Sequence, residues 1–146
     1  MATVHASCVA VDGRGVLLLG PPGSGKSDLA LRLIDGGAVL VADDRVDIRA
    51  AGGRLRASPP KTLAGRMEVR GLGILALDWR PRATLALAVE LLTGSGPARL
   101  PEPAAWRYGG IALPLIRVAP FESSAAAKVR LAARAADTGP DPGGAP

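Results

Sequence analysis

The sequence contains few cysteines, few aromatic residues and no long apolar runs, and each shortage excludes a class of protein. Its 146 residues include one cysteine, Cys8, which cannot form a disulfide within the chain. The longest apolar runs, such as 16–19 and 85–89, fall far short of the roughly 20 residues that cross a bilayer. The first ten residues lack the basic stretch and apolar centre of a secretory signal. We therefore expect a cytoplasmic protein without a transmembrane helix.

The charge of the chain is basic but not clustered. It carries 18 lysines and arginines against 13 aspartates and glutamates, which gives a formal net charge of +5. The basic residues are scattered singly, and only 3% of the chain is aromatic, so few rings are present to stack on bases. We therefore do not expect a nucleic-acid or membrane partner. The positive field instead favours phosphate ligands or an acidic protein surface.

The length and apolar content fit one α/β domain. A chain of this size, with 48% hydrophobic residues, can bury one core without a disulfide. The domain is expected to span 1–136. The remaining segment, 137–146, is mostly Pro, Gly and Asp and is predicted to be a disordered tail.

Hydrophobic periodicity and turn residues divide this domain into strands and helices. Asp12-Gly13 and Gly52-Gly53 mark hairpin turns, and Gly36-Gly37 marks the end of a helix. Pro114 predicts that the last strand lies at a sheet edge. The expected strands are 3–11, 15–19, 38–42, 46–49, 54–57, 84–92 and 111–118, and the expected helices are 26–34 and 123–136.

The strongest motif lies between a predicted strand and a predicted helix. It matches G-x-x-x-x-G-K-[ST] and reads Gly20-Pro21-Pro22-Gly23-Ser24-Gly25-Lys26-Ser27. Its glycines allow successive backbone N–H groups to surround a phosphate, and the helix N-terminus adds partial positive charge. Lys26 is expected to reach the β- and γ-phosphates, and Ser27 to offer its hydroxyl to Mg²⁺. The motif predicts a nucleotide-binding P-loop.

Two adjacent carboxylates, Asp43 and Asp44, follow the predicted strand at 38–42. The carboxyl end of a strand is where α/β sheets place their ligands, so one or both carboxylates are expected beside the P-loop. A carboxylate there can hold Mg²⁺ or accept a proton from an attacking hydroxyl. An exposed acidic turn is the alternative interpretation.

Other polar residues are less specific by themselves. His5 is the single histidine and lies in an apolar strand, where a histidine is more often structural than catalytic. Glu68 and Arg70 alternate with apolar neighbours, so they are expected on one face of a strand. Gly71 follows directly, and a glycine allows close approach of the backbone to a ligand. An ordinary charged strand face explains the same pattern.

Taken together, these motifs resemble the catalytic domain of the bacterial HPr kinase/phosphorylase family. The resemblance joins His5, the P-loop at 20–27, Val41-Ala42-Asp43-Asp44 and Glu68-Val69-Arg70-Gly71-Leu72-Gly73-Ile74, in the family's order and near its spacings. It covers about residues 3–136 and implies a P-loop kinase domain with a mixed, partly antiparallel sheet. It also implies a short form that lacks the N-terminal regulatory domain.

The resemblance implies ATP and Mg²⁺ as cofactors and a serine of the phosphocarrier protein HPr, or an HPr-like protein, as substrate. The metal would be held by Ser27, Asp43 and Glu68. The nucleotide would be bound by the P-loop together with Arg70 and Gly71. The family forms hexamers, which implies a homo-oligomer.

The resemblance also assigns catalytic roles. Lys26 would bind the phosphates, and Asp44 would take the serine proton in the forward direction. His5, a structural residue on its own, becomes a site residue, because it precedes Lys26 by the family's spacing. Arg107, which precedes Tyr108-Gly109, is the candidate for the family's later catalytic arginine.

Some residues depart from the family pattern. Ala6 replaces a glycine and Asp28 replaces a glutamate, both conservatively. The segment that the family associates with dephosphorylation reads Ala119-Pro120-Phe121-Glu122-Ser123 and lacks its arginines, so the phosphorolytic direction stays open. A small-molecule P-loop kinase and a module that senses ATP without transfer are the alternative functions.

Overall fold

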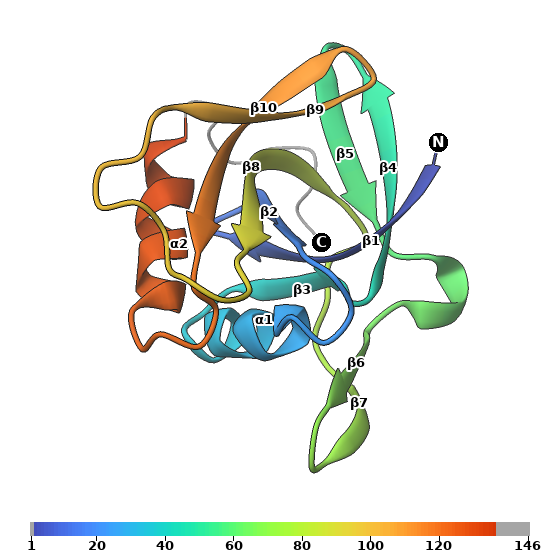
Figure 1. Ribbon diagram of the computed structural model, residues 1–146. Coiled ribbons are helices and arrows are strands. Elements are labelled where there is room, and N and C mark those ends of the chain that lie inside the picture. The colour runs from blue at the N-terminus through green and yellow to red at the C-terminus, as the bar shows by residue number, and fades with distance from the viewer. Residues whose placement is uncertain (1, 137–146) are drawn as a thin grey trace.

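The computed structural model describes residues 2–136, which form a strongly curved sheet with two helices packed beside it (Figure 1). The helices are α1 (Lys26–Asp35) and α2 (Ala125–Ala135), and a 3-10 turn spans Lys61–Leu63. The strands are β1 (Ala2–Val11), β2 (Arg14–Leu19), β3 (Val39–Ala42), β4 (Arg45–Ala51), β5 (Arg54–Ser58), β6 (Arg66–Val69), β7 (Gly73–Ala76), β8 (Ala83–Leu91), β9 (Ala104–Tyr108) and β10 (Ile111–Val118). The predicted α/β class with a mixed sheet is confirmed.

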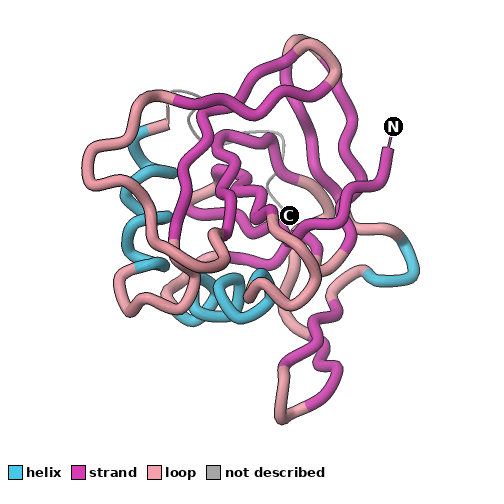
Figure 2. Tube along the Cα trace, in the orientation of Figure 1, coloured by secondary structure: helices cyan, strands magenta, loops and turns pink. Residues whose placement is uncertain are grey.

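The main sheet closes on itself. Its order is β2-β1-β4-β5-β8-β10-β9, and β2 also pairs with β8, so five strands complete a circuit that Figure 2 shows wrapping around the centre of the molecule. At the junction, β8 runs antiparallel to β5 and parallel to both β2 and β10. The carboxyl ends of β2, β8 and β10 therefore meet at one edge of the sheet, which is where α/β proteins bind ligands.

The central strands divide their side chains between two cores, as the two-residue period of a strand requires. In β1, Cys8 and Ala10 belong to a cluster of strand residues only, while Val9 and Val11 belong to a cluster that includes both helices. A shift of register by one residue would exchange these sets, so the register of β1 is tightly specified.

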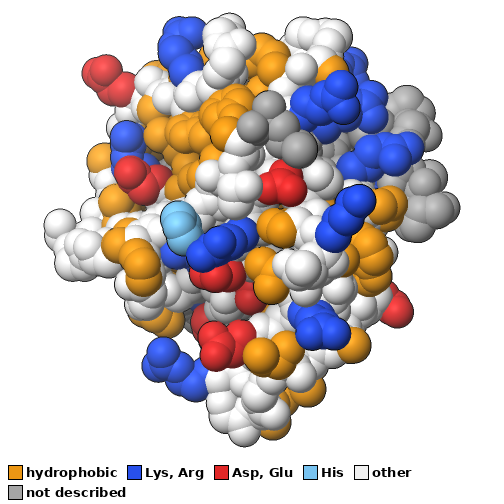
Figure 3. Space-filling model, turned by 90° about the vertical axis from the view of Figure 1, so that its right-hand side faces the viewer, with side chains coloured by type: hydrophobic (Ala, Val, Ile, Leu, Met, Phe, Trp, Pro, Cys, Tyr) orange, Lys and Arg blue, Asp and Glu red, His pale blue; other side chains and the backbone are white. Residues whose placement is uncertain are grey.

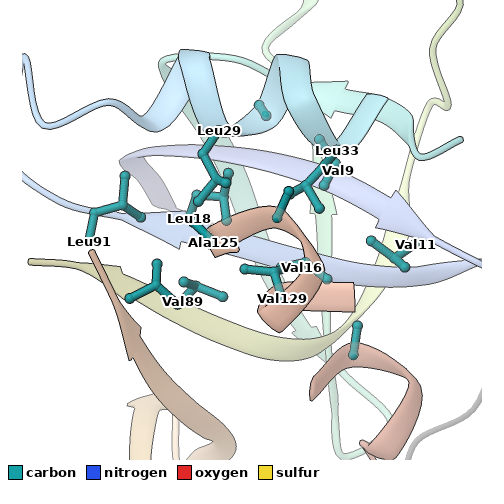
Figure 4. Packing of buried hydrophobic residues seen from close by; sticks show 14 of the residues in the cluster. Val9, Val11, Val16, Leu18, Leu29, Leu33, Val89, Leu91, Ala125 and Val129 are labelled. Carbon is teal, nitrogen blue, oxygen red and sulfur yellow. The ribbon is translucent and has the colours of Figure 1, made fainter. Parts of the chain in front are cut away.

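Helix α1 packs on the sheet through one apolar face. Leu29 and Leu33 are fully buried one turn apart, and Figure 4 shows them beside Val9 and Leu18, with Val129 of α2 in the same cluster. Burial of each leucine contributes about 1.5–3 kcal/mol. The helix ends where predicted, because Gly36 donates its N–H to the carbonyls of the last turn and Gly37 has a positive φ of 112°.

Both predicted hairpin turns are present. Asp12 and Gly13 have φ values of 50° and 80°, and Gly52 and Gly53 have 61° and 75°. Two consecutive positive φ values match the type I′ turn, whose twist suits antiparallel strands. The turns connect β1 to β2 and β4 to β5.

The predicted edge position of the last strand is wrong, because β10 lies between β8 and β9. Pro114 is tolerated because β10 pairs with β9 over Ile111–Leu115 and with β8 only from Leu115 onward. At Pro114 the strand has one partner, so the missing N–H interrupts no ladder on the β8 side. Strands β7 and β9 were not expected from the sequence.

The predicted tail at 137–146 lies outside the described residues. Within the described part, neither helix has the length and apolar character needed to span a membrane.

Cys8 provides a test of the strand core. It is fully buried, and burial raises the pKa of its thiol to about 12. Since the thiolate is the reactive form, the native thiol should not react with a disulfide reagent at pH 8, whereas the urea-unfolded chain should react within minutes. Spectrophotometric thiol titration checks this, and rapid stoichiometric labelling of the native protein would contradict the burial.

Candidate active site

The P-loop connects the end of β2 to the start of α1, as the motif predicted. Gly23 and Gly25 have φ values of 78° and 102°, which side chains with a Cβ rarely adopt, so the loop conformation depends on glycine there. Gly20 has a different role, because a Cβ there would lie 2.5 Å from Ser24 Oγ and would displace the Ser24 side chain. The loop is closed by a hydrogen bond from Ser24 N–H to the Pro21 carbonyl.

Lys26 and Ser27 are the first two residues of helix α1, and hydrogen bonds hold their side chains. The Lys26 ammonium donates to the Gly20 carbonyl at 2.7 Å and to the Pro21 carbonyl at 3.0 Å. The Ser27 hydroxyl donates to Asp43 Oδ1 at 2.7 Å. The lysine charge therefore lies within the loop that is expected to surround a phosphate.

The Asp43 carboxylate joins three segments beneath the P-loop. It is 6% exposed. Its Oδ1 accepts hydrogen bonds from Ser7 of β1 and from Ser27 of α1, at 2.8 and 2.7 Å. Its Oδ2 accepts a longer bond, 3.4 Å, from the Glu68 N–H of β6. A buried carboxylate is tolerable only with such partners, so Asp43 fixes the three segments relative to one another.

Asp44, the next residue, lies in the opposite environment. It is exposed, has a positive φ of 66°, and sits at the centre of a tight turn in which Arg45 N–H donates to the Asp43 carbonyl at 2.7 Å. Aspartate is among the few residues other than glycine that tolerate this region, and such strained positions concentrate at functional sites. The Ala6 N–H, which donates to the Asp44 carbonyl at 3.2 Å, holds the turn against β1. The turn thus buries one carboxylate and exposes its neighbour.

The β6–β7 hairpin forms the other wall of the site and projects from the body of the molecule (Figure 1). Met67 and Val69 are buried beside α1, while Glu68 and Arg70 are exposed. The alternation predicted for this segment is therefore confirmed. The turn between the strands contains Gly71, which has a positive φ of 91°.

These segments enclose a cleft of about 700 Å³, within the size range of small-molecule sites. It brings together nine of the residues predicted for the site: Pro22, Gly23, Gly25, Lys26, Ser27, Asp44, Glu68, Arg70 and Gly71. Figure 3 shows part of this side of the molecule, where acidic and basic side chains gather close to the histidine.

The remaining predicted residues lie outside the lining of the cleft. Asp43 is buried beneath it, and Gly20, Pro21 and Ser24 belong to the loop itself. His5 is exposed on β1 and pairs with Arg45, the residue after Asp44, so it lies near the cleft.

Arg107 is not brought to the cleft. It is exposed on β9, next to the turn that lies against Ala50 at the far end of β4. In Figure 1, β9 runs along the top of the molecule, while α1 lies in its lower half. Arg107 therefore lies away from the P-loop of its own chain, although it precedes Tyr108-Gly109 as the resemblance implied.

Ser7 and Phe121 are among the residues of the site that sequence reasoning missed. Ser7 binds Asp43, and its only signal was a hydroxyl within an otherwise apolar strand. Phe121 lines the cleft from the loop after β10, and it lies in the segment 119–123, where no ligand-binding residue was predicted. Its only signal in the sequence was that the chain contains a single phenylalanine.

The donors in the cleft fit a magnesium ion that also binds phosphate. Ser27 and Glu68 supply oxygen atoms, which Mg²⁺ prefers. Across residues 2–136, no group of three or more His, Cys, Asp or Glu side chains is arranged to hold an ion. Since Mg²⁺ commonly binds one or two carboxylates and completes its shell with water and substrate phosphate, this sparse donor set suits it.

The role of Asp43 as a structural link can be tested by Asp43→Ala. The substitution leaves the buried Ser7 hydroxyl and the partly buried Ser27 hydroxyl without their acceptor, so we expect the free energy of unfolding to fall by about 1–3 kcal/mol. Urea denaturation measures this value. The control is Asp35→Ala, which removes an exposed carboxylate at the end of α1 and should change stability by about 0.5 kcal/mol or less. Equal effects of the two variants would contradict the assignment.

Comparisons with known proteins agree with this arrangement. A family model described as HPr Serine kinase C-terminal domain matches residues 1–79. The chain is 49% identical over 72 residues to the HPr kinase/phosphorylase of Clostridium botulinum, and 50% identical over 74 residues to that of Caldanaerobacter subterraneus. These matches cover 49% and 50% of this chain and 24% of each relative. The chain therefore spans about a quarter of the length of the curated relatives it matches.

The fold comparison extends over nearly the whole chain. The solved structure of the Hpr(Ser) kinase/phosphatase from Coxiella burnetii superposes with a TM-score of 0.79 at 26% sequence identity, and the match covers 92% of this chain and 95% of that chain. The family model covers more than half of the sequence and includes the P-loop, both aspartates and the hairpin residues of the cleft. The chain belongs to the HPr serine kinase C-terminal domain family.

Proposed function

We propose that this chain is an ATP- and Mg²⁺-dependent protein-serine kinase that phosphorylates an HPr-like phosphocarrier protein. The observation that carries the proposal is one cleft lined by Lys26 and Ser27 of the P-loop and by Asp44 on the neighbouring turn. The relatives named HPr kinase/phosphorylase support the choice of substrate. The hexamer and the phosphorolytic reverse reaction, both implied by the resemblance, stay predictions.

The reaction needs few chemical groups, because phosphoryl transfer depends mainly on positioning and on charge stabilisation. The serine oxygen attacks the γ-phosphorus of ATP, the bond from that phosphorus to the β,γ-bridging oxygen breaks, and ADP leaves. The serine proton passes to the Asp44 carboxylate. A bound Mg²⁺ would neutralise phosphate charge, with Ser27 and Glu68 as its protein ligands.

Each described residue has a distinct part in this scheme. Lys26 turns from the carbonyls of the loop to the phosphates, and the amides at the start of α1 bind the same oxygens. Asp43 does not line the cleft, so we assign it to holding Ser27 rather than to the metal itself. Arg70 adds a positive charge at the hairpin wall. His5, adjacent to the Asp44 turn, is a candidate for stabilising that carboxylate.

The lysine is tested by Lys26→Ala. Loss of the ammonium removes the only lysine in the lining of the cleft, so phosphorylation of a purified HPr-like protein should fall below detection while the urea midpoint stays close to that of the parent. Lys61→Ala, an exposed lysine outside the cleft, is the matched control and should keep the parental rate. Transfer retained by Lys26→Ala would refute the P-loop assignment.

The base is tested by Asp44→Asn. Asparagine also tolerates a positive φ, so the turn should persist, but an amide cannot accept the serine proton. We expect the rate of transfer to fall about 10²- to 10⁴-fold, with ATP affinity nearly unchanged. Asp78→Asn, an exposed aspartate outside the cleft, is the control. A parental rate in Asp44→Asn would reject the base role.

The same assay separates the alternatives. ATP is supplied with the HPr-like proteins of the organism and, in parallel, with a panel of small metabolites, and the reverse reaction is followed with added inorganic phosphate. Transfer to a metabolite alone would favour a small-molecule kinase. Tight binding of Mg-ATP without any transfer would favour a sensor.

A further inference from the structure

A second cleft, of about 530 Å³, adjoins the first. The two clefts share Gly23 of the P-loop and Phe121. The walls of the second are formed by the loops that follow β8 and β10, and its lining comprises Gly23, Ser24, Leu92, Thr93, Gly94, Gly96, Ala119, Pro120, Phe121 and Glu122. Because β8 and β10 run parallel to β2, this cleft lies at the carboxyl ends of three parallel strands.

The chemistry of the second cleft differs from that of the first. The phosphate cleft is lined by Lys26 and Arg70, whereas the only charged residue among the described lining of the second is Glu122, which is paired with Lys128 at 3.0 Å. Its other polar side chains are the hydroxyls of Ser24 and Thr93. Ser24 is 4% exposed, and its Oγ has no hydrogen-bond partner within the described part of the chain. Such a lining suits a neutral group with hydrogen-bonding edges and not a phosphate.

Phe121 stands between the two clefts. It is the single phenylalanine of the chain and is 71% exposed, so its ring is accessible to a ligand in either cleft. Its ring lies directly over Gly25, since a Cβ at that position would be 2.9 Å from Phe121 Cζ. The ring is therefore adjacent to the residue that immediately precedes helix α1.

The loop that carries this ring is fixed to helix α1. Arg32 donates hydrogen bonds to the carbonyls of Pro120 and Glu122, the two neighbours of Phe121 in the chain. Arg32 is in turn paired with Asp28 at 3.1 Å within the same helix. The wall between the clefts is thus preformed, which lowers the entropy cost of binding against it.

We propose that the second cleft binds the base and ribose of the nucleotide whose phosphates occupy the P-loop, and that Phe121 stacks on the base. This inference rests on the proposed function, because it takes the P-loop ligand to be a nucleotide. It assigns the exposed hydroxyl of Thr93 to a polar edge of the nucleoside. It also makes Phe121 a residue for nucleotide affinity, with no part in the transfer step.

The test compares two probes on the full chain by titration calorimetry: Mg-ATP and magnesium tripolyphosphate, which has the three phosphates without the nucleoside. Aromatic stacking on a base strengthens binding roughly 5- to 100-fold. Phe121→Ala should therefore weaken Mg-ATP binding by at least about 5-fold and leave tripolyphosphate binding unchanged, while Phe121→Tyr should restore the parental Mg-ATP affinity. Leu131→Ala, an exposed leucine on α2 outside both clefts, is the control.

A second variant, Gly96→Leu, obstructs the second cleft and leaves Phe121 unchanged. Gly96 has no positive φ, and a Cβ there would point to Glu122 at 3.4 Å, so Gly96→Leu places its side chain in the second cleft. This variant should also weaken Mg-ATP binding and spare tripolyphosphate. If both variants leave Mg-ATP binding unchanged, or reduce the two probes equally, the inference is overturned.

The affinities of the parental protein for the two probes give a further test. Equal affinity for the two probes would overturn the inference, since the nucleoside would then contribute nothing, and would leave transfer to an HPr-like protein unaffected. A chain that prefers Mg-ATP through Phe121 but transfers no phosphate to any phosphocarrier would support the inference and overturn the proposed function alone.

Discussion

The buried carboxylate of Asp43 is the interaction on which the site depends. A charge removed from water is tolerated only when donors surround it, and here the donors come from β1, α1 and β6, three segments far apart in the chain. The requirement for these donors determines where the P-loop helix begins relative to the strand that carries His5 and to the hairpin that carries Glu68. The arrangement of the cleft therefore follows from the hydrogen bonds that the Asp43 carboxylate requires.

The two adjacent aspartates have different environments because of a single backbone angle. A β-strand would send Asp43 and Asp44 to opposite faces, but both faces are covered at the end of β3. The positive φ of Asp44 instead turns the chain sharply into β4 and leaves its carboxylate at the cleft. Such a conformation is costly, and three hydrogen bonds within and around the turn, donated by Ala6, Arg45 and the Asp44 amide, offset the cost.

Much of this arrangement could be predicted from the sequence, and the exceptions have a common physical cause. The P-loop, helix α1, the type I′ turns and the alternation of Glu68 with Met67 are local, because spacing and turn chemistry specify them. Closure of the sheet by β2 and β8, the position of β10 and the separation of Arg107 from the cleft depend on strand pairing over long distances in sequence. Ser7 and Phe121 could not be found for the same reason, since their partners come from other segments.

The hydrogen bond between Ser27 and Asp43 has one more consequence. An ionised carboxylate can only accept hydrogen bonds, so the Ser27 hydroxyl must be the donor and its proton must point down into the protein. The lone pairs of the same oxygen are thereby directed away from Asp43. The hydrogen bond therefore fixes the orientation of a hydroxyl that would otherwise rotate freely. Its oxygen lone pairs then face the cleft, where a cation can bind them.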